Sequence, residues 1–188
     1  PFSFSGKRYT LTDIDVHPKP VQPGGPPLWI AAMSTPGALR AARFETNLLP
    51  QGKRADVLDP YREAVKQAGA DPMDRRVGII RSFYVTDDRE RDWPTIRNAE
   101  RFRMSVYTDF MEATPDDYGW REPGGIPQGA FMGTVDECVA EIVHFVREFG
   151  ITDIASSGLP PGVDPDFMAR NLDRLATEVL PQVRNQLS

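Results

Sequence analysis

The sequence is poor in the residues that bind metals or form disulfides. It contains one cysteine, Cys138, and two histidines, His17 and His144. A lone cysteine cannot form a disulfide within the chain, which fits a reducing compartment and leads us to expect a cytoplasmic protein. The two histidines lie far apart in the sequence, and no cysteine or carboxylate cluster joins them at ligand spacing. No metal site is therefore predicted.

The chain also lacks a long apolar run and an excess of positive charge. No segment approaches the roughly 20 apolar residues that span a bilayer, so we expect no association with a membrane. Lys and Arg number 22 against 27 Asp and Glu, a formal net charge of −5. This balance argues against broad binding to nucleic acid. The G-x-S-x-G, Walker and G-x-G-x-x-G motifs are absent as well.

What remains is the composition of an ordinary globular domain. The chain has 188 residues, of which 40% are hydrophobic and 26% charged, enough for one domain with a substantial core. We expect a single domain over residues 1–188. Residues 1–27 alternate weakly and then become rich in Pro and Gly, which predicts an extended arm or hairpin followed by a lead-in.

Beyond the arm, hydrophobic spacing predicts strands that alternate with helices. Strands are expected over 28–33, 47–50, 77–86 and 151–156, and helices over 36–44, 56–69, 94–113, 134–149 and from 164 onward. Residues 114–133 are rich in turn formers and are expected to be an irregular loop. Such alternation indicates an α/β class with a parallel sheet. The chain is too short for a closed eight-stranded barrel, which takes about 250 residues.

Two helices have predicted buried faces that the structure can test. In the helix that Pro94 is expected to start, the apolar positions are Ile96, Ala99, Phe102, Val106 and Phe110. In the last helix they are Met168, Leu172, Leu175, Ala176 and Val179. Both sets recur at helical spacing, so each predicts one stripe facing the core.

The most informative segment is Pro26–Gly37. Its continuous apolar run, Leu28–Met33, predicts a strand buried on both faces. Ser34 then offers a hydroxyl N-cap, and Pro36 suits the first helical turn. A buried strand that leads directly into a helix N-terminus directs backbone N–H groups and the positive dipole end at one spot. Such a corner suits a phosphate group, although it could also be a plain strand-to-helix turn.

Several segments resemble, in the same order, parts of a known family. These are 18–27 with the strand 28–30, the helix start 38–43, the strand 47–50, the next helix and turn at Tyr61–Ala64 and Ala68–Pro72, and Tyr84–Asp88, Gly133–Cys138 and Phe149–Asp153. On these residues the chain resembles the C-terminal portion of the bacterial-luciferase-like oxidoreductases, which use a flavin or a deazaflavin. The resemblance implies a partial (β/α)8 TIM barrel that holds only the C-terminal strands and helices.

The resemblance also implies a cofactor, FMN or a deazaflavin of the coenzyme F420 type, bound at the carboxyl ends of the strands. The implied phosphate positions are Ala32, Met33, Ser34 and Thr35, and further cofactor contacts are expected at Ser156, Ser157 and Gly158. The chain departs from the family at Ala31-Ala32, where family members usually have two glycines. It departs again at 45–48, where they often have a Gly-Asp-Gly-Trp-like stretch.

The expected function is therefore oxidation, monooxygenation or hydride transfer on a small organic substrate. No residue is assigned as catalytic acid or base, because most barrel strands lie outside this sequence. The expected partners are the reduced cofactor, a missing N-terminal barrel half or complementing chain, and a second copy in a homodimer. The alternative is a non-catalytic remnant or interaction module with a barrel-derived fold.

Overall fold

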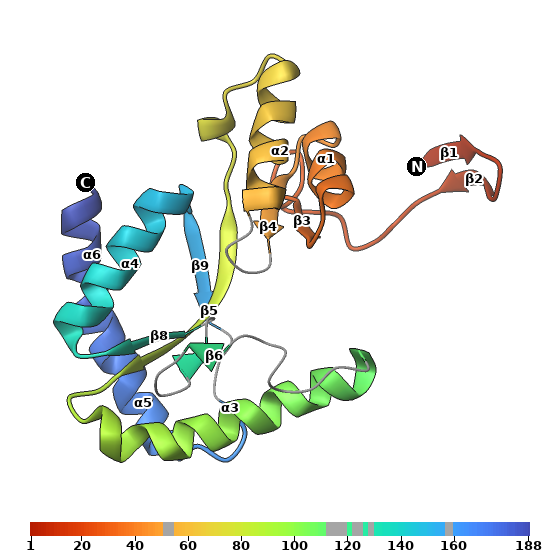
Figure 1. Cartoon of the computed structure of the whole chain (residues 1–188). Coiled ribbons are helices and arrows are strands. Elements are labelled where there is room, and N and C mark those ends of the chain that lie inside the picture. The colour runs from red at the N-terminus through yellow and green to blue at the C-terminus, as the bar shows by residue number, and fades with distance from the viewer. Residues whose placement is uncertain (51–54, 112–119, 122–125, 128–129, 157–159) are drawn as a thin grey trace.

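The computed structural model describes the chain except residues 51–54, 112–119, 122–125, 128–129 and 157–159. Its parallel strands are β3 (Trp29–Ala32), β4 (Asn47–Pro50), β5 (Gly78–Val85), β8 (Ala130–Gly133) and β9 (Asp153–Ser156). The helices are α1 (Thr35–Arg43), α2 (Ala55–Gln67), α3 (Arg89–Met111), α4 (Val135–Phe149), α5 (Pro165–Arg174) and α6 (Leu180–Leu187), with a 3-10 turn at Pro72–Asp74 and a π-helical turn at Leu175–Val179. The predicted α/β class is confirmed (Figure 1).

The described strands form a curved, open array. β3 pairs with β4 in parallel from Trp29–Asn47 to Ala32–Pro50. β5 pairs with β9 along its first half and with β8 along its second half. A single parallel bridge between Leu48 and Val77 joins the two groups. All of these pairs are parallel, so the carboxyl ends of the strands gather at one edge, but no closed barrel forms from the described residues.

Helices cover the outer face of this array. α1 packs against α2, and α4 packs against β8 and α6. The main core holds Leu48, Ile79 and Phe83 from the strands and Tyr61 and Ile142 from the helices. A second cluster lies between α3, β8 and α5 and includes Tyr84, Trp93 and Met132.

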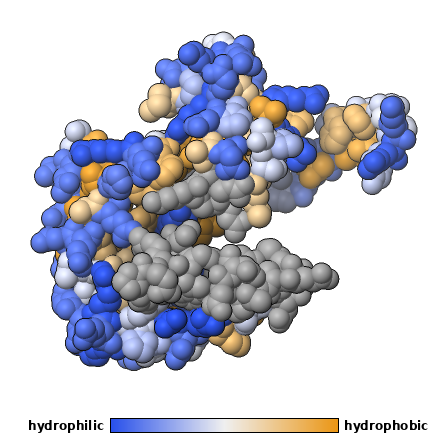
Figure 2. Space-filling view, in the orientation of Figure 1, coloured by the Kyte–Doolittle hydropathy of each residue, from blue (hydrophilic) through white to orange (hydrophobic). Residues whose placement is uncertain are grey.

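The N-terminal arm forms the predicted hairpin. Strands β1 (Phe2–Ser5) and β2 (Thr10–Ile14) pair antiparallel, and the hairpin projects from the body of the molecule (Figure 1). Apolar surface is visible on it in Figure 2, where Phe2 and Phe4 are each about half exposed.

The strand predicted over 28–33 is shorter and less buried than expected. β3 spans Trp29–Ala32, and only Ala32 is buried, while Ala31 and the flanking Leu28 and Met33 are exposed. The expectation of burial on both faces was wrong because, among the described elements, helices cover only one face of β3. Its other face is the inner face of the curved sheet.

Helix α3 begins five residues before the predicted start at Pro94. Asp88 caps it, since the Arg91 N–H donates to Asp88 Oδ1 at 3.0 Å, and Pro94 lies inside the helix. Ile96 and Ala99 are buried as predicted, but Phe102 and Val106 are 59% and 48% exposed. The apolar stripe therefore extends past the elements that cover it. The predicted Phe110 position and the end of the helix near 113 lie outside what the structure describes at side-chain level.

The predicted loop 114–133 contains strands that the sequence reasoning missed. β8 ends this segment and is fully buried beside β5, and the two-residue strands β6 (Trp120–Arg121) and β7 (Ile126–Pro127) pair with each other. In the last helical region, Met168, Leu175 and Val179 are buried as predicted, whereas Leu172 and Ala176 are exposed.

Candidate functional site

The predicted phosphate corner lies at the carboxyl end of β3, where α1 begins. Ser34 occupies the N-cap position with extended backbone, and its carbonyl accepts the first helical hydrogen bond from the Ala38 N–H at 3.0 Å. The Ser34 hydroxyl makes no capping bond, so the predicted hydroxyl cap is wrong. The exposed Ser34 hydroxyl is therefore not used to cap the N-terminus of α1.

The backbone at this corner suits an anion. An α-helix leaves its first N–H groups without intrahelical partners, and here these belong to Thr35 and Gly37, since Pro36 has none. The first turn carries no acidic side chain. The Thr35 hydroxyl donates to the Asp56 carbonyl of α2 at 3.1 Å, so this side chain fixes the corner against α2 while its N–H stays in the first turn.

Gly37 is a corner residue that the sequence reasoning did not single out. A Cβ atom there would lie 3.0 Å from the Ala32 Cβ. This distance is tighter than ordinary contact, so Gly37 lets α1 start close above β3. The small side chains of Ala31 and Ala32 at the end of β3 also leave room for this close approach. The signal in the sequence was the cluster of small residues around the Pro36 turn.

The other predicted positions follow β9. Ser156 is exposed at the end of this strand, in register with Arg81 of β5. Ser157 and Gly158 lie outside the described residues. β4 and β5 lie between β3 and β9 along this edge. The structure thus brings the corner and Ser156 to the carboxyl edge, on separate strands.

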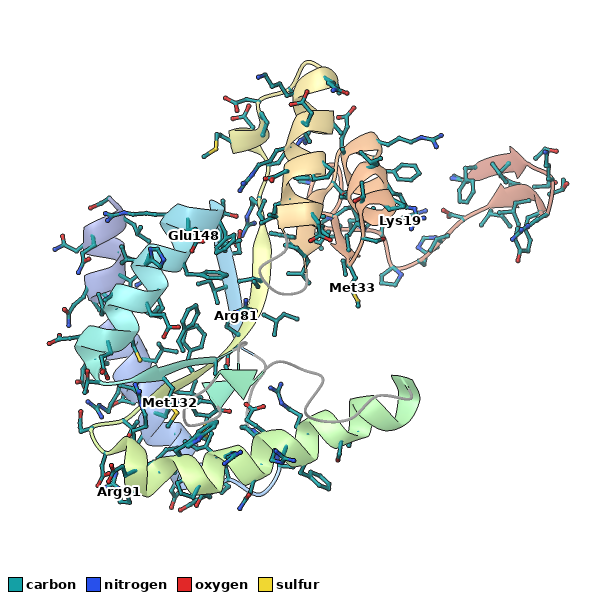
Figure 3. All side chains as sticks on the ribbon, viewed as in Figure 1. Lys19, Met33, Arg81, Arg91, Met132 and Glu148 are labelled. Atoms are coloured by element: carbon teal, nitrogen blue, oxygen red, sulfur yellow. The ribbon has the colours of Figure 1, made fainter. Side chains whose placement is uncertain are left out.

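Between these positions, the inner face of the sheet is mostly apolar, and no described element crosses it there. Ala31, Ile80 and Ala155 are exposed there, and Ile80 is 50% exposed. Met33 extends from the end of β3 beyond this face (Figure 3) and is 56% exposed. Toward the amino ends of the strands, Arg76 lies over the Trp29 ring at 5.2 Å and pairs with Asp153.

A buried polar cluster also lies along the second half of β5, and the sequence reasoning missed it. The Glu100 side chain of α3 is fully buried and accepts hydrogen bonds from Ser82 and Tyr84 of β5 and from Arg103 of α3. Burial, with the adjacent carboxylate, raises the pKa of the Tyr84 phenol far above its usual range. The available signal was a charged residue four positions after Ile96, on the predicted apolar stripe.

The remaining reactive side chains occupy structural positions. Cys138 is fully buried, and this burial raises the pKa of its thiol to about 11, which keeps it protonated and unreactive at neutral pH. His144 is exposed on α4 and lies 3.3 Å from Glu148. Asp87 and Asp88 are exposed; Asp88 caps α3 and Asp87 pairs with Arg174.

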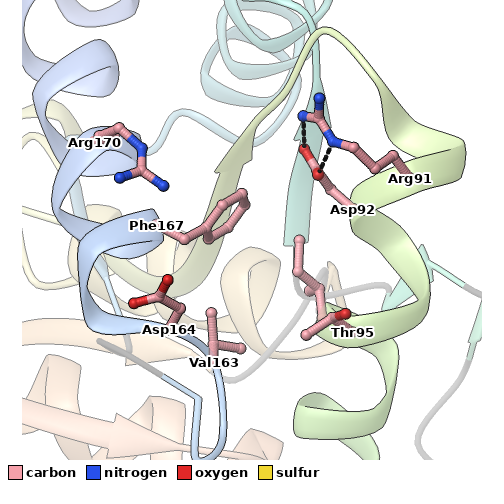
Figure 4. Close-up of a pocket in the computed structure, with 8 residues that line it drawn as sticks. Arg91, Asp92, Thr95, Val163, Asp164, Phe167 and Arg170 are labelled. Atoms are coloured by element: carbon pink, nitrogen blue, oxygen red, sulfur yellow. Dashed lines mark hydrogen bonds and ion pairs between the residues drawn. The ribbon is translucent and has the colours of Figure 1, made fainter.

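A cavity of about 320 Å³ lies between the start of α3 and α5 (Figure 4). Ile96, Val163 and Phe167 line it, and two arginines and two aspartates also contribute. Arg91 is held by Asp92 through bonds of 2.6 and 2.9 Å. The lining charges balance, so this cavity favours no charged class of ligand, and none of the predicted site residues lines it. None of the helices in the described part of the chain is long and apolar enough to cross a membrane.

The fold and the carboxyl-edge site together define a partial TIM-barrel protein, and comparison with known proteins identifies its family. The sequence profile of the luciferase-like monooxygenase family matches residues 1–153. The chain belongs to this family. No curated protein matches the sequence.

Solved structures support the fold. Monooxygenase RslO1 from Streptomyces bottropensis has a TM-score of 0.72 at 22% identity, over 96% of this chain and 55% of that protein. An F420-dependent secondary alcohol dehydrogenase, solved with an F420-acetone adduct, has a TM-score of 0.70 at 22% identity, over 98% of this chain and 56% of that protein. The FMN-bound oxygenating constituent of 3,6-diketocamphane monooxygenase from Pseudomonas putida has a TM-score of 0.67 at 16% identity, over 97% of this chain and 58% of that protein. The chain spans just over half the length of these proteins.

Proposed function

We propose that this chain forms the C-terminal half of a flavin- or deazaflavin-dependent oxidoreductase that acts on a small organic substrate. Membership of the luciferase-like monooxygenase family supports the reaction class. The observation that carries the proposal is the strand-to-helix corner at Ala32–Thr35, at the carboxyl edge where barrel proteins bind their ligands.

The residues present fit the phosphate end of FMN or of an F420-type cofactor. The N–H groups of Thr35 and Gly37 lie in the free first turn of α1, the Ser34 hydroxyl is not used for capping, and the first turn of α1 itself carries no acidic side chain. Met33 and Ser156 would contact the same ligand from β3 and β9. A bound cofactor of this type supplies hydride transfer or oxygen activation. The chain itself orients it and covers one side of it.

The substrate would lie on the open inner face of the sheet. Ala31, Ile80 and Ala155 give the middle of this face an apolar lining. Such a lining favours a neutral organic molecule and helps to keep water away from the reacting atoms.

Replacing Ser34 by Asp tests the phosphate site without weakening the helix. Asp is as good an N-cap as Ser and favours the positive end of the helix dipole, so α1 remains stable. The added charge repels a phosphate group. In the full-length protein we expect Ser34→Asp to weaken FMN binding at least tenfold in a fluorescence titration. Ser34→Ala loses one hydroxyl donor but adds no charge, so it should weaken binding less.

Riboflavin, which has no phosphate, provides the matched control ligand. Its affinity is expected to be the same for the wild type and Ser34→Asp. Equal FMN affinity in the wild type and in Ser34→Asp would show that the phosphate does not bind at this corner. If the wild type binds neither FMN nor F420, the non-catalytic alternative replaces the enzyme proposal.

A further inference from the structure

The buried cluster on β5 and α3 contains a carboxylate that needs a permanent positive partner. Glu100 accepts from the Ser82 hydroxyl at 3.1 Å, from the Tyr84 hydroxyl, and from Arg103 Nε at 2.9 Å. Every one of these partners is a donor, so the arrangement suits the ionised carboxylate. A buried charge is tolerated only when it is paired and hydrogen-bonded in this way.

Arg103 is held rigidly by this carboxylate and still has donors to spare. Its Nε and Nη2 both face Glu100, and Nη2 also lies 3.5 Å from Ser82 Oγ. The side chain is 24% exposed, and its Nη1 makes no hydrogen bond with any residue that the structure describes. Because a guanidinium has five N–H donors in a fixed plane, the outward ones have a defined direction.

The cluster continues the inner face of the sheet toward the carboxyl edge. A Cβ atom at Gly78 would touch Leu49 and Trp29, which places this position on the inner face. Side chains alternate along a strand, so Ile80 and Ser82 share that face with Gly78. Glu100 and Arg103 therefore adjoin the exposed Ile80. Two strand spacings, roughly 10 Å, separate β5 from the corner on β3.

We propose that Arg103 binds the ring of the reduced cofactor and stabilises the negative charge that the ring acquires on reduction. This inference rests on the proposed function. In FMN a ribityl chain separates the phosphate from the ring, so a phosphate at Ser34 leaves the ring to extend toward β5. Reduced flavins and deazaflavins carry negative charge on the N1–C2=O edge when N1 is deprotonated, and a nearby cation lowers the energy of that form. Glu100 acts as the positioning residue for Arg103.

The competing interpretation is an ion pair that only stabilises the packing of α3 on β5. The two interpretations differ in what happens to the bound cofactor. A purely structural pair changes the stability of the protein but not the relative affinity for oxidised and reduced cofactor. A ring-binding guanidinium changes that ratio, and the midpoint potential of the bound cofactor reports it directly.

The test is a redox titration of the full-length protein with bound FMN, and separately with F420. Glu100→Gln with Arg103→Gln removes both charges together and leaves no unpaired buried carboxylate. We expect the double variant to bind the reduced form at least tenfold more weakly relative to the oxidised form. For a two-electron couple this ratio lowers the potential by about 30 mV.

Arg103→Lys and Arg97→Gln complete the set. Lysine keeps the charge opposite Glu100 and hence the fold, but it loses the outward planar donors, so an intermediate shift is expected. Arg97 is an exposed arginine on the same helix, and its replacement should leave the potential unchanged. A wild-type potential in both Arg103 variants would overturn the inference while the cofactor site stands. A wild type that binds neither cofactor overturns the proposed function, and the role of Arg103 with it.

Discussion

Asn171 shows how much one buried polar side chain contributes to the edge of this sheet. Its Oδ1 accepts from the Val85 N–H at 2.6 Å, and its Nδ2 donates to the Phe83 carbonyl at 2.8 Å. The side chain thus satisfies two backbone groups of β5 from α5, and the residue is 2% exposed. These two hydrogen bonds attach α5 to β5.

Replacing Asn171 by Leu should therefore be strongly destabilising. The variant leaves a buried donor and a buried acceptor of β5 unsatisfied, each of which costs about 1–3 kcal/mol. We expect the free energy of unfolding, measured by urea denaturation, to fall by about 2–5 kcal/mol. Asn185→Leu, at an exposed site on α6, should change it by less than about 0.5 kcal/mol. Similar losses in both variants would contradict the role assigned to Asn171.

Asp153 should make stability depend on pH in the acid range. The Arg76 guanidinium, followed by the Thr152 hydroxyl, lowers the pKa of Asp153 below its ordinary value of 3.8. The folded state thus prefers the ionised form. The contribution is complete above the ordinary value and is lost as the pH falls through the lower pKa of the folded state.

The measurement is the unfolding free energy of the wild type and of Asp153→Asn between about pH 6 and pH 2. The wild type should be more stable at the upper end, and the difference should narrow below about pH 4. Asp173→Asn, at an exposed carboxylate that forms no ion pair with the described residues, should show no such convergence. A constant difference down to the lowest pH would rule out the ion pair as its source.

At the scale of elements, the capping box of α4 is both predictable and testable. The Glu137 N–H donates to Thr134 Oγ1 at 3.3 Å, and the Thr134 N–H donates to Glu137 Oε2 at 2.8 Å. Thr134→Ala removes the first of these bonds and should destabilise the protein by about 1 kcal/mol in thermal or urea unfolding. Thr134→Ser keeps the hydroxyl and should retain most of the stability. If both variants lose the same amount, the hydroxyl is not the stabilising group.

The elements with local signals were predicted from the sequence. The strand at 47–50 has the predicted bounds, α4 lies between its Thr134 cap and a left-handed Gly150, and α5 begins at Asp164-Pro165. β8 was missed because it is only four residues long and ends the turn-rich segment 114–133, so it carries no clear periodic signal. The predicted start of α3 was wrong because both Asp88 and Pro94 are typical of a helix start. The structure uses the Asp88 cap, and Pro94 lies inside the helix.

The candidate site was predictable from the sequence only where the local backbone conformation determines it. The corner at Ala32–Thr35 follows from a strand that leads into a helix, which is a local pattern. Glu100 and Arg103 meet Ser82 and Tyr84 only because α3 folds back along β5, a contact between segments about 20 residues apart that no spacing rule gives. Whether Ala31 and Ala32 replace the family's glycines without loss of binding stays a prediction.

At the scale of the whole molecule, the main feature is the inner sheet face, which α3 covers along the second half of β5 but which has no described element across it from β3 to Ile80. Ala31, Ile80 and Ala155 lie exposed on this face, and Phe102 and Val106 of α3 are exposed as well. Similar solved structures are nearly twice as long as this chain. A half-barrel that exposes this much apolar surface and unpaired strand edges is prone to associate. We therefore expect a complementary barrel segment, in the same chain or another, to cover it.

Ile80→Lys tests this closure, because Ile80 is central on the inner face. If a complementary segment covers the face in the full-length protein, the lysine charge becomes buried without a partner, and stability should fall by at least about 3 kcal/mol. Met73→Lys, at a position that is 74% exposed beside the 3-10 turn, is the matched control and should be nearly neutral. Urea denaturation of both variants decides the matter. An Ile80→Lys protein as stable as the control would show that this face remains open to solvent, and the complementary segment would then have to lie elsewhere.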